Sequence, residues 1–316
     1  MAATALAQPP VGRLAPSPTG AQHVGNARTY LLAWLSIRSR GGRLILRIED
    51  IDSPRVKRGA QEQAIEDLSW LGLDWDDGPY VQTQRLELYQ AALTRLQAAE
   101  RVYPCTCTRS DVAAAASAPH AGQEGPIYPG KCAGCSVADA HSLIAAGVPF
   151  AWRFRATDKK RTVHDLVAGE QSCNVARELG DFVIGKSDAT PAYQLAVVVD
   201  DAALGVTEVL RGDDLLPSAF RQLEIYESLG HPPPAFAHVP LVVGSDGRRL
   251  AKRHGDTRLA TLREQGITPE RLVGLLAWSS GLIDQPAPCQ PRDLLAVFSL
   301  SRLPREPWIW KSEFAL

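Results

Sequence analysis

Two short motifs near opposite ends of the chain carry residues that could bind a triphosphate. The first, PSPTGAQHVGN over residues 16–26, contains Gly20 and Gly25, which let the backbone approach a ligand closely, and His23, which adds a hydrogen-bond donor. A helix that starts directly after this loop would point its positive end and its free N–H groups at a phosphate. The second motif, RLAKR over residues 249–253, is basic. Together they predict a nucleotide held from two sides.

The elements around the first motif read as a βαβ unit. Val11–Leu14 is a short apolar run typical of a buried strand, residues 27–35 have helical spacing, and Arg43–Glu49 alternates like a second strand. Taken alone, the first motif could be an ordinary strand-to-helix turn, and the second a solvated basic loop. Their occurrence together, each after a predicted strand, favours an α/β nucleotide-binding domain.

The rest of the chain alternates between helical and strand-like patterns, and residues 104–135, rich in Cys, Gly, Ala and Pro, read as an insertion. Spacing of apolar residues predicts helices over Ala60–Leu71, Leu86–Arg101, Leu216–Leu229, Arg258–Gln265, Pro269–Ser280 and Arg292–Phe298. Strands are predicted over Ala151–Arg155, Asp181–Ile184, Tyr193–Val199, Thr207–Leu210 and Val239–Val243.

Composition is that of a soluble globular protein: 316 residues, 45% hydrophobic, 22% charged and a formal net charge of -1. There is no global basic field, so a nucleic acid would have to be met by a local patch. No apolar run is long enough to span a bilayer, and Met1–Pro10 lacks the features of an export signal. We therefore expect a cytoplasmic protein that does not contact membranes, with residues 1–10 as a disordered tail.

Four of the six cysteines form a cluster, Cys105, Cys107, Cys132 and Cys135. In a chain without an export signal, such a cluster indicates a metal more than disulfides, and thiolate-rich sites suit a structural Zn²⁺. Cys132 and Cys135 have good CxxC spacing. Free thiols without metal remain the plainer alternative.

The two motifs together resemble the signatures of class I aminoacyl-tRNA synthetases, in the glutamyl and glutaminyl branch. RLAPSPTG at 13–20 with HVG at 23–25 is similar to the first signature, and LAKR at 250–253 to the glutamyl form of the second, with Arg249 replacing its first lysine. The resemblance implies that a substrate carboxylate attacks the α-phosphate of ATP, bound with Mg²⁺, and that His23 and Lys252 stabilise the reacting phosphate. The implied ATP-binding residues are Pro16, Thr19, Gly20, His23, Gly25, Asn26, Arg249, Leu250, Ala251, Lys252 and Arg253.

The same resemblance indicates the amino acid. Glu49 in LRIEDID matches the residue that binds the α-amino group, Tyr193 in YQLAVVVDD a substrate tyrosine, and Arg211 in VLRGDD a carboxylate-binding arginine. Arginine binds carboxylates through paired hydrogen bonds, so these residues with Arg13 suit L-glutamate better than glutamine. Structural ion pairs among Arg13, Glu49 and Arg211 are the plainer alternative. The implied glutamate-binding residues are Arg13, Ala15, Ser17, Glu49, Tyr193 and Arg211.

Two positions depart from the pattern of full-length glutamyl enzymes, which commonly carry Asn where this chain has Val197 and an aromatic residue where it has Leu215. For the cysteine cluster, the resemblance implies one structural zinc held by Cys105, Cys107, Tyr128 and Cys132. Residue chemistry alone would choose Cys135 over a phenol as the fourth ligand.

The resemblance covers only the catalytic part of a glutamyl-tRNA synthetase, with no anticodon-binding domain. It implies a Rossmann-type α/β class I catalytic domain with an inserted zinc-binding, acceptor-like subdomain and a short C-terminal helical region. The expected division is a tail at 1–10, the first catalytic half at 11–102, the insertion at 103–180, the second half at 181–245, and the KMSKS-like loop with a helical stem-contact-like region at 246–316.

By its resemblance to truncated members of this family, we expect the protein to activate glutamate without tRNA and to attach it to queuosine in the anticodon of tRNA(Asp). We also expect a monomer. A truncated synthetase that charges a tRNA 3′ end is one alternative, and a non-catalytic zinc module that binds ATP and glutamate is another. The presence of His23, Glu49, Tyr193, Arg211 and Lys252 argues against a dead site.

Overall fold

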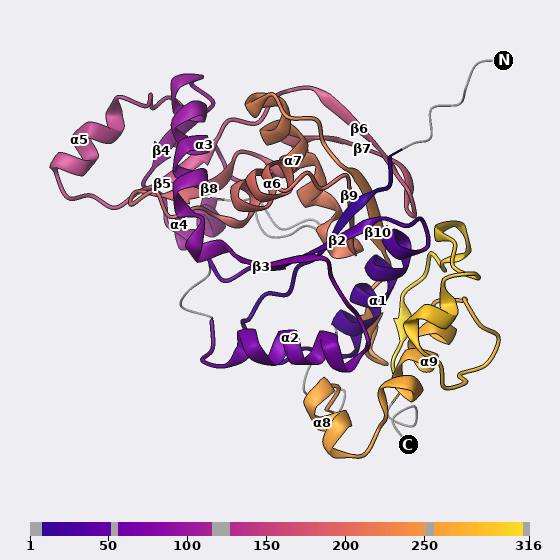
Figure 1. The fold of residues 1–316 in the computed structure, drawn as a ribbon. Helices are drawn as coiled ribbons and strands as arrows, with labels where there is room; N and C mark the ends of the chain where they lie inside the picture. Colours follow the sequence, from indigo (N-terminus) through magenta and orange to yellow (C-terminus); the bar gives the residue numbers. More distant parts are fainter. Residues whose placement is uncertain (1–7, 52–55, 116–126, 249, 251–255, 312–316) are drawn as a thin grey trace.

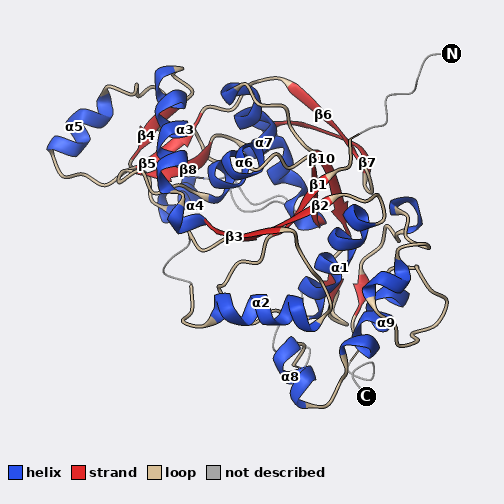
Figure 2. Ribbon diagram, viewed as in Figure 1, coloured by secondary structure: helices blue, strands red, loops and turns tan. Residues whose placement is uncertain are grey.

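A parallel β-sheet lies between two layers of helices in the computed structural model, which describes residues 8–51, 56–115, 127–248, 250 and 256–311 (Figure 2). Its strands are β1 (Val11–Leu14), β2 (Arg43–Ile48), β3 (Asp77–Val81), β9 (Glu208–Gly212) and β10 (Ala235–Val239). The first three pair in the order β1-β2-β3, and β9 pairs with β10. The Thr207 N–H donates to the Val11 carbonyl over 2.8 Å and joins the two groups, so β1 has neighbours on both sides. Ligands of open α/β sheets bind where the strand order reverses in this way.

Helices cover both faces of this sheet (Figure 1). One face packs against α1 (Val24–Arg38), α2 (Ala60–Trp70), α8 (Leu259–Glu264) and α9 (Pro269–Ser279), and the other against α3 (Leu86–Ala98), α6 (Tyr193–Ala203) and α7 (Leu216–Leu229). The side chains of strand β2 explain why both faces of the sheet are covered. Its residues Leu44, Leu46 and Ile48 enter the first apolar cluster, whereas Ile45 enters the second. Strand β2 is therefore buried on both faces, as expected for a parallel sheet, and Arg47 on the same strand is buried with these apolar residues.

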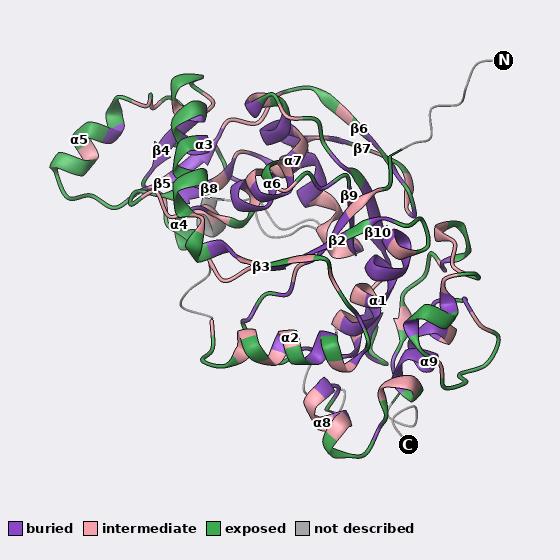
Figure 3. Cartoon of the chain, in the orientation of Figure 1, coloured by how far each residue is buried: buried purple, intermediate pink, exposed green. Residues whose placement is uncertain are grey.

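The chain between β3 and β9 adds a second region. Strands β4 (Val102–Cys105), β5 (Ala151–Phe154) and β8 (Phe182–Lys186) form an antiparallel sheet in the order β4-β5-β8, and β6 (Lys160–Asp165) pairs with β7 (Gly169–Asn174). Two short helices, α4 (Arg109–Ala115) and α5 (Asp139–Ala145), complete it, and α5 is largely exposed (Figure 3). The Leu166 N–H, just after β6, donates to the Phe236 carbonyl of β10 over 2.8 Å, so this hairpin flanks the parallel sheet.

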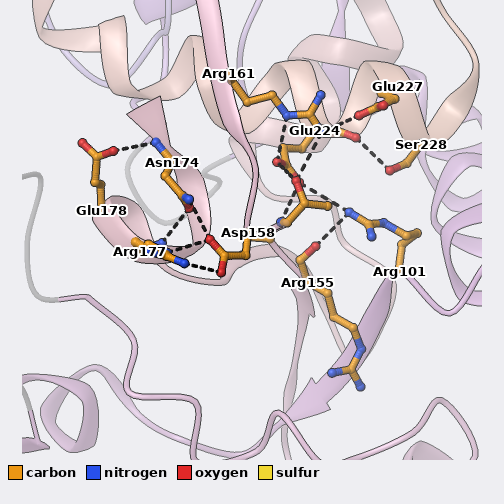
Figure 4. A network of polar contacts seen from close by, with 12 residues as sticks. Arg101, Arg155, Asp158, Arg161, Asn174, Arg177, Glu178, Glu224, Glu227 and Ser228 are labelled. Carbon is orange, nitrogen blue, oxygen red and sulfur yellow. Dashed lines mark hydrogen bonds and ion pairs between the residues drawn. The ribbon is translucent and has the colours of Figure 1, made fainter. Parts of the chain in front are cut away.

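A buried carboxylate ties this region to α7 (Figure 4). Glu224 is fully buried and accepts hydrogen bonds from the Thr157 N–H at 3.0 Å, from Arg161 Nε at 3.1 Å and from Arg101 Nη2 at 3.4 Å. Arg161 also pairs with Glu227 on the next turn of α7. A buried charge is tolerated only with several such partners, and these come from both regions.

The C-terminal segment packs against α1. Strand β11 (Val242–Val243) pairs with β12 (Trp308–Ile309), and two short 3-10 helices span Pro291–Leu294 and Leu300–Arg302. The guanidinium of Arg28 in α1 donates to Ser280 Oγ at 3.0 Å and to the Pro240 carbonyl at 2.7 Å. No helix in the described ranges has both the length and the apolar character that a membrane span requires.

The helices predicted over Ala60–Leu71, Leu86–Arg101 and Leu216–Leu229 are confirmed as α2, α3 and α7, and those over Arg258–Gln265 and Pro269–Ser280 as α8 and α9. The strand predicted over Tyr193–Val199 is wrong, because this segment begins helix α6. Its three consecutive valines have high strand propensity, but packing of Leu195, Ala196 and Val198 against neighbouring elements overrides that preference.

Two further predictions need correction. The strand expected over Val239–Val243 is divided: β10 ends at Val239, Pro240 supplies no N–H, and β11 pairs with a different strand. The helix expected over Arg292–Phe298 is only the 3-10 helix Pro291–Leu294.

Candidate active site

A cavity of about 660 Å³ opens at the carboxyl ends of β1 and β9, where the strand order reverses. Its size is in the range of cofactor and substrate sites. It brings together twelve of the residues predicted from the sequence: Arg13, Ala15, Ser17, Thr19, Gly20, His23, Gly25, Asn26, Glu49, Tyr193, Arg211 and Leu250. Pro16 does not line it, but its carbonyl accepts the Glu49 N–H over 3.0 Å and so fixes the start of the following loop.

His23 caps helix α1 with its side chain. Its Nδ1 accepts the Gly25 N–H over 3.0 Å, and the Asn26 side chain accepts the His23 N–H over 3.1 Å. This reciprocal arrangement is a capping box, which stabilises the first turn of the helix. Because Nδ1 is an acceptor, the neutral imidazole carries its proton on Nε2. A Cβ at Gly25 would lie 2.9 Å from His23 Cε1, so only glycine leaves the ring in this position.

Leu250 of the second motif and residues that follow the motif lie next to the first motif. Leu250 lines the cavity. The Val24 N–H donates to the Thr257 carbonyl over 3.0 Å, and the Leu259 N–H donates to the Gln22 carbonyl over 2.9 Å. The predicted ATP-binding residues Arg249, Ala251, Lys252 and Arg253 lie outside the described part of the chain.

Glu49 is held by a buried arginine that the sequence did not single out. Arg47 Nη2 donates to Glu49 Oε1 over 2.8 Å, and Arg47 Nη1 donates to Asp201 Oδ1 over 2.5 Å. Burial opposes the charge of Arg47, but Asp201, Glu49 and Asp200 raise its pKa above the ordinary range. The ion pair of Glu49 is therefore with Arg47, and not within the predicted trio of Arg13, Glu49 and Arg211.

Arg13 and Arg211 are both buried in the cavity wall. Arg13 Nη1 donates to the Leu210 carbonyl over 3.0 Å, its Nε lies 4.0 Å from Asp201 Oδ1, and burial lowers its pKa. Arg211 Nε donates to His238 Nε2 over 3.0 Å. Arg211 Nη1 is buried without a hydrogen-bond acceptor among the residues that the structure describes, which is costly unless a ligand supplies one.

Tyr193, the first residue of α6, faces the same cavity, and burial of its hydroxyl raises its pKa. Sequence reasoning missed Thr29, Tyr30 and Ala33, which line the cavity from α1. They follow Asn26 by three, four and seven residues, which is the spacing of one helix face, and this could have identified them. Leu215, noted as a departure, also lines the cavity.

A second cluster lies in the inserted region. The sulfur atoms of Cys105, Cys107 and Cys132 all lie within 4.8 Å of one another, and those of Cys107 and Cys132 are 3.7 Å apart. The Tyr128 hydroxyl lies 3.4 Å from Cys105 Sγ and 3.7 Å from Cys107 Sγ. Zn–S bonds of about 2.3 Å at tetrahedral angles would place two sulfur atoms about 3.8 Å apart, so these side chains fit a zinc ion.

The ligand candidates differ in protonation: burial raises the pKa of the Cys107 thiol and that of the Tyr128 phenol, whereas the pKa of Cys132 is lowered. Burial opposes ionisation of Cys132, but hydrogen bonds from Tyr128 and the Thr106 backbone lower its pKa to about 7. A thiolate is the form that binds zinc. Cys135 is not in the group of three sulfur atoms, and burial raises the pKa of its thiol.

Comparison with known proteins identifies this architecture. The chain belongs to the family described as "tRNA synthetases class I (E and Q), catalytic domain", and the match covers residues 11–285. Within that family it belongs with the glutamyl-Q tRNA(Asp) synthetases: it is 54% identical to the one from Rhodopirellula baltica over 95% of this chain and 96% of that relative. The corresponding protein of Symbiobacterium thermophilum is 53% identical over 94% of both chains.

A solved structure agrees. The glutamate tRNA ligase from Elizabethkingia meningosepticum, solved in complex with its amino acid, has a similar structure, with a TM-score of 0.83 and 26% sequence identity. The match covers 98% of this chain and 68% of the ligase chain. The expected class I synthetase catalytic fold is thus confirmed.

Proposed function

We propose that the protein activates L-glutamate with ATP and Mg²⁺ to glutamyl-adenylate, without tRNA, and then transfers glutamate to the queuosine base in the anticodon of tRNA(Asp). The observation that carries this proposal is a cavity that joins the first motif to two buried arginines, in a chain 54% identical to a glutamyl-Q tRNA(Asp) synthetase.

In the first step, an oxygen of the substrate α-carboxylate attacks the α-phosphate of ATP, and the bond to the β-phosphate breaks to release pyrophosphate. No protein nucleophile is needed. Catalysis then consists of positioning the two substrates and stabilising charge on the reacting phosphate. We assign that stabilisation to His23, whose Nδ1 accepts the Gly25 N–H so that Nε2 carries the proton of the neutral ring, and to Lys252.

Different residues are proposed to bind the α-amino group and the side-chain carboxylate of glutamate. Glu49, fixed by Arg47, is proposed to bind the α-amino group, and Tyr193 to contact the substrate beside it. Arg211 has a buried N–H in need of an acceptor, and with Arg13 it provides the positive charge that a side-chain carboxylate requires. Ala15 and Ser17 line the same wall after β1.

In the second step, a hydroxyl of the queuosine cyclopentenediol attacks the carbonyl carbon of glutamyl-adenylate and AMP leaves. An anticodon loop is single-stranded, so its bases can enter a protein cavity. Charging of a tRNA 3′ end uses the same adenylate and is the alternative acceptor.

For the second cluster, we propose one structural zinc held by Cys105, Cys107, Cys132 and Tyr128, because these four side chains have the spacing described above. The metal would join the segments around residues 105 and 132 and take no part in the reaction. We also propose the domain division given above, with β8 joining the antiparallel sheet of the insertion.

We also propose that the protein is a monomer, and the substrates ATP and tRNA favour the cytoplasm as its location. Light scattering of the purified protein would measure its mass directly.

The test combines two assays. ATP–pyrophosphate exchange is expected with glutamate and not with glutamine, in the absence of tRNA. Labelled glutamate is then offered with ATP to tRNA(Asp) with queuosine, to tRNA(Asp) without it, and to tRNA(Glu). Labelling of only the first tRNA supports the proposal. Labelling of tRNA(Glu) but not of queuosine-bearing tRNA(Asp) would overturn the acceptor, and stronger exchange with glutamine would overturn the amino acid.

A further inference from the structure

We propose that Asp165 and His238 form a buried relay that positions Arg211 for the side-chain carboxylate of the amino-acid substrate. His238 would then be a positioning residue that determines specificity without touching the substrate. The inference rests on the proposed activation of glutamate and extends it to two residues outside the cavity wall.

The relay follows from strand register. Arg211 on β9 and His238 on β10 are direct partners in the parallel sheet, and Arg211 Nε donates to His238 Nε2 over 3.0 Å. On the other side of the ring, His238 Nδ1 lies 2.6 Å from Asp165 Oδ2, at the end of β6. All three side chains are buried, with exposed fractions of 5% or less.

The protonation state of the ring is fixed by its neighbours. The Nε–H of an arginine can only donate, so His238 Nε2 must accept, and the proton of the neutral ring lies on Nδ1, where Asp165 accepts it. Burial lowers the pKa of His238, and the charges of Arg211 and Arg13 lower it further, while Asp165 opposes them. The neutral form is therefore the one that the surroundings favour.

Asp165 is itself fixed by the backbone. Its Oδ1 accepts the N–H groups of Val167 at 3.0 Å, Ala168 at 2.8 Å and His238 at 3.0 Å. These bonds lower the pKa of the Asp165 carboxyl although burial opposes its ionisation. The carboxylate thus has one orientation, and its second oxygen sets the plane of the imidazole.

A neutral acceptor leaves the charge of Arg211 available. A carboxylate at position 238 would pair with the guanidinium and compete with the substrate for it. An imidazole fixes the geometry without cancelling the charge. Arg211 Nε is bonded to His238 and Nη2 to the Leu215 carbonyl at 3.3 Å, which leaves buried Nη1 as the N–H group for the ligand.

The relay predicts which substitutions should weaken glutamate binding and which should not. His238→Leu removes the acceptor, whereas His238→Gln keeps a neutral oxygen near the position of Nε2. Asp165→Asn would present an N–H to Nδ1, which moves the ring proton to Nε2 and sets two donors against each other. Glu224→Gln is the matched control, because Glu224 is a buried carboxylate that also joins the inserted region to the catalytic sheet and has no bond to Arg211.

The experiment measures ATP–pyrophosphate exchange by the full-length wild type and the four variants, with KM for glutamate, KM for ATP and the ratio of kcat/KM for glutamate over glutamine. Thermal unfolding identifies variants that are only destabilised. We expect His238→Leu and Asp165→Asn to raise the KM for glutamate about tenfold, as for one lost hydrogen bond to a charged group, and to lower the glutamate preference. In these two variants, the KM for ATP should stay within twofold of the wild-type value. In His238→Gln and Glu224→Gln, the KM for glutamate should stay within threefold of the wild-type value.

Failure of the relay and failure of the proposed function give different results. An active wild type whose folded His238→Leu and Asp165→Asn variants retain the glutamate KM and the glutamate preference would overturn the relay alone. A parallel rise in the glutamate KM of Glu224→Gln would also overturn it, since a general structural effect would then explain the result. A wild type without glutamate-dependent exchange would instead overturn the proposed function.

Discussion

Replacement of Arg47 by methionine is expected to destabilise the protein strongly, although Arg47 does not line the cavity. The guanidinium is completely buried, and its Nη1 and Nη2 lie 2.5 Å and 2.8 Å from Asp201 and Glu49. Asp201 is 1% exposed, and after Arg47 the second arginine that pairs with it is Arg13, whose Nε lies 4.0 Å from Asp201 Oδ1. Methionine fills a similar volume but leaves this carboxylate buried with little compensation.

The cost can be approximated from the burial of the pair. Removing one partner of a buried ion pair costs about 3–5 kcal/mol. At about 2 °C per kcal/mol for a chain of this size, the melting temperature should fall by roughly 6–10 °C. Adding Asp201→Asn to Arg47→Met removes the stranded charge, so the double variant should recover part of the loss.

Differential scanning calorimetry at pH 7 measures the effect, with Arg43→Met as the matched control. Arg43 lies on the same strand and pairs with Asp77 over 3.0 Å, but it is 47% exposed, so its loss should cost about 0–1 kcal/mol. Equal shifts for the two single variants would refute the reasoning, and so would a double variant less stable than Arg47→Met.

Two further predictions concern the capped helix and the cysteine cluster. Gly25→Ala should place a Cβ 2.9 Å from the His23 ring and lower kcat for pyrophosphate exchange about tenfold or more. Because alanine favours helices, the melting temperature should not fall, and a kcat within twofold of wild type would contradict the role of His23. For the metal, elemental analysis of protein purified with zinc should find one zinc per chain in Cys135→Ser and less in Tyr128→Phe, and the reverse would make Cys135 the fourth ligand.

The cavity residues that were predicted share a simple property: each lies within or directly beside a contiguous motif. The loop at 16–26 connects a strand to a helix, and in a βαβ unit that loop always lies at the carboxyl edge of the sheet. Glu49 directly follows β2 and Arg211 is the last residue but one of β9, so both lie at the carboxyl end of a strand of the parallel sheet. Strand direction therefore explains why Glu49 and Arg211 lie near the loop, whereas their choice as site residues, like that of Tyr193, came from the family resemblance.

The residues that support this site could not be predicted, because their partners are remote in the sequence. Arg47 and Asp201 are 154 positions apart, and Asp165 and His238 are 73 apart. Their contacts depend on strand register and on helix α6, a segment whose consecutive valines led to the prediction of a strand. A single histidine in an apolar strand gives no signal of a relay before its neighbouring strand is known.

The supporting residues also explain which charges of the cavity are available to a substrate. Arg47 is matched by the carboxylates of Glu49, Asp201 and Asp200. Arg13 and Arg211 lie in the cavity wall, where the side-chain carboxylate of glutamate could pair with them and the neutral amide of glutamine could not. Arg211 keeps its charge for the substrate only while its neighbour at position 238 is neutral. A histidine whose pKa is lowered by burial meets that requirement, and an acidic residue in the same place would not.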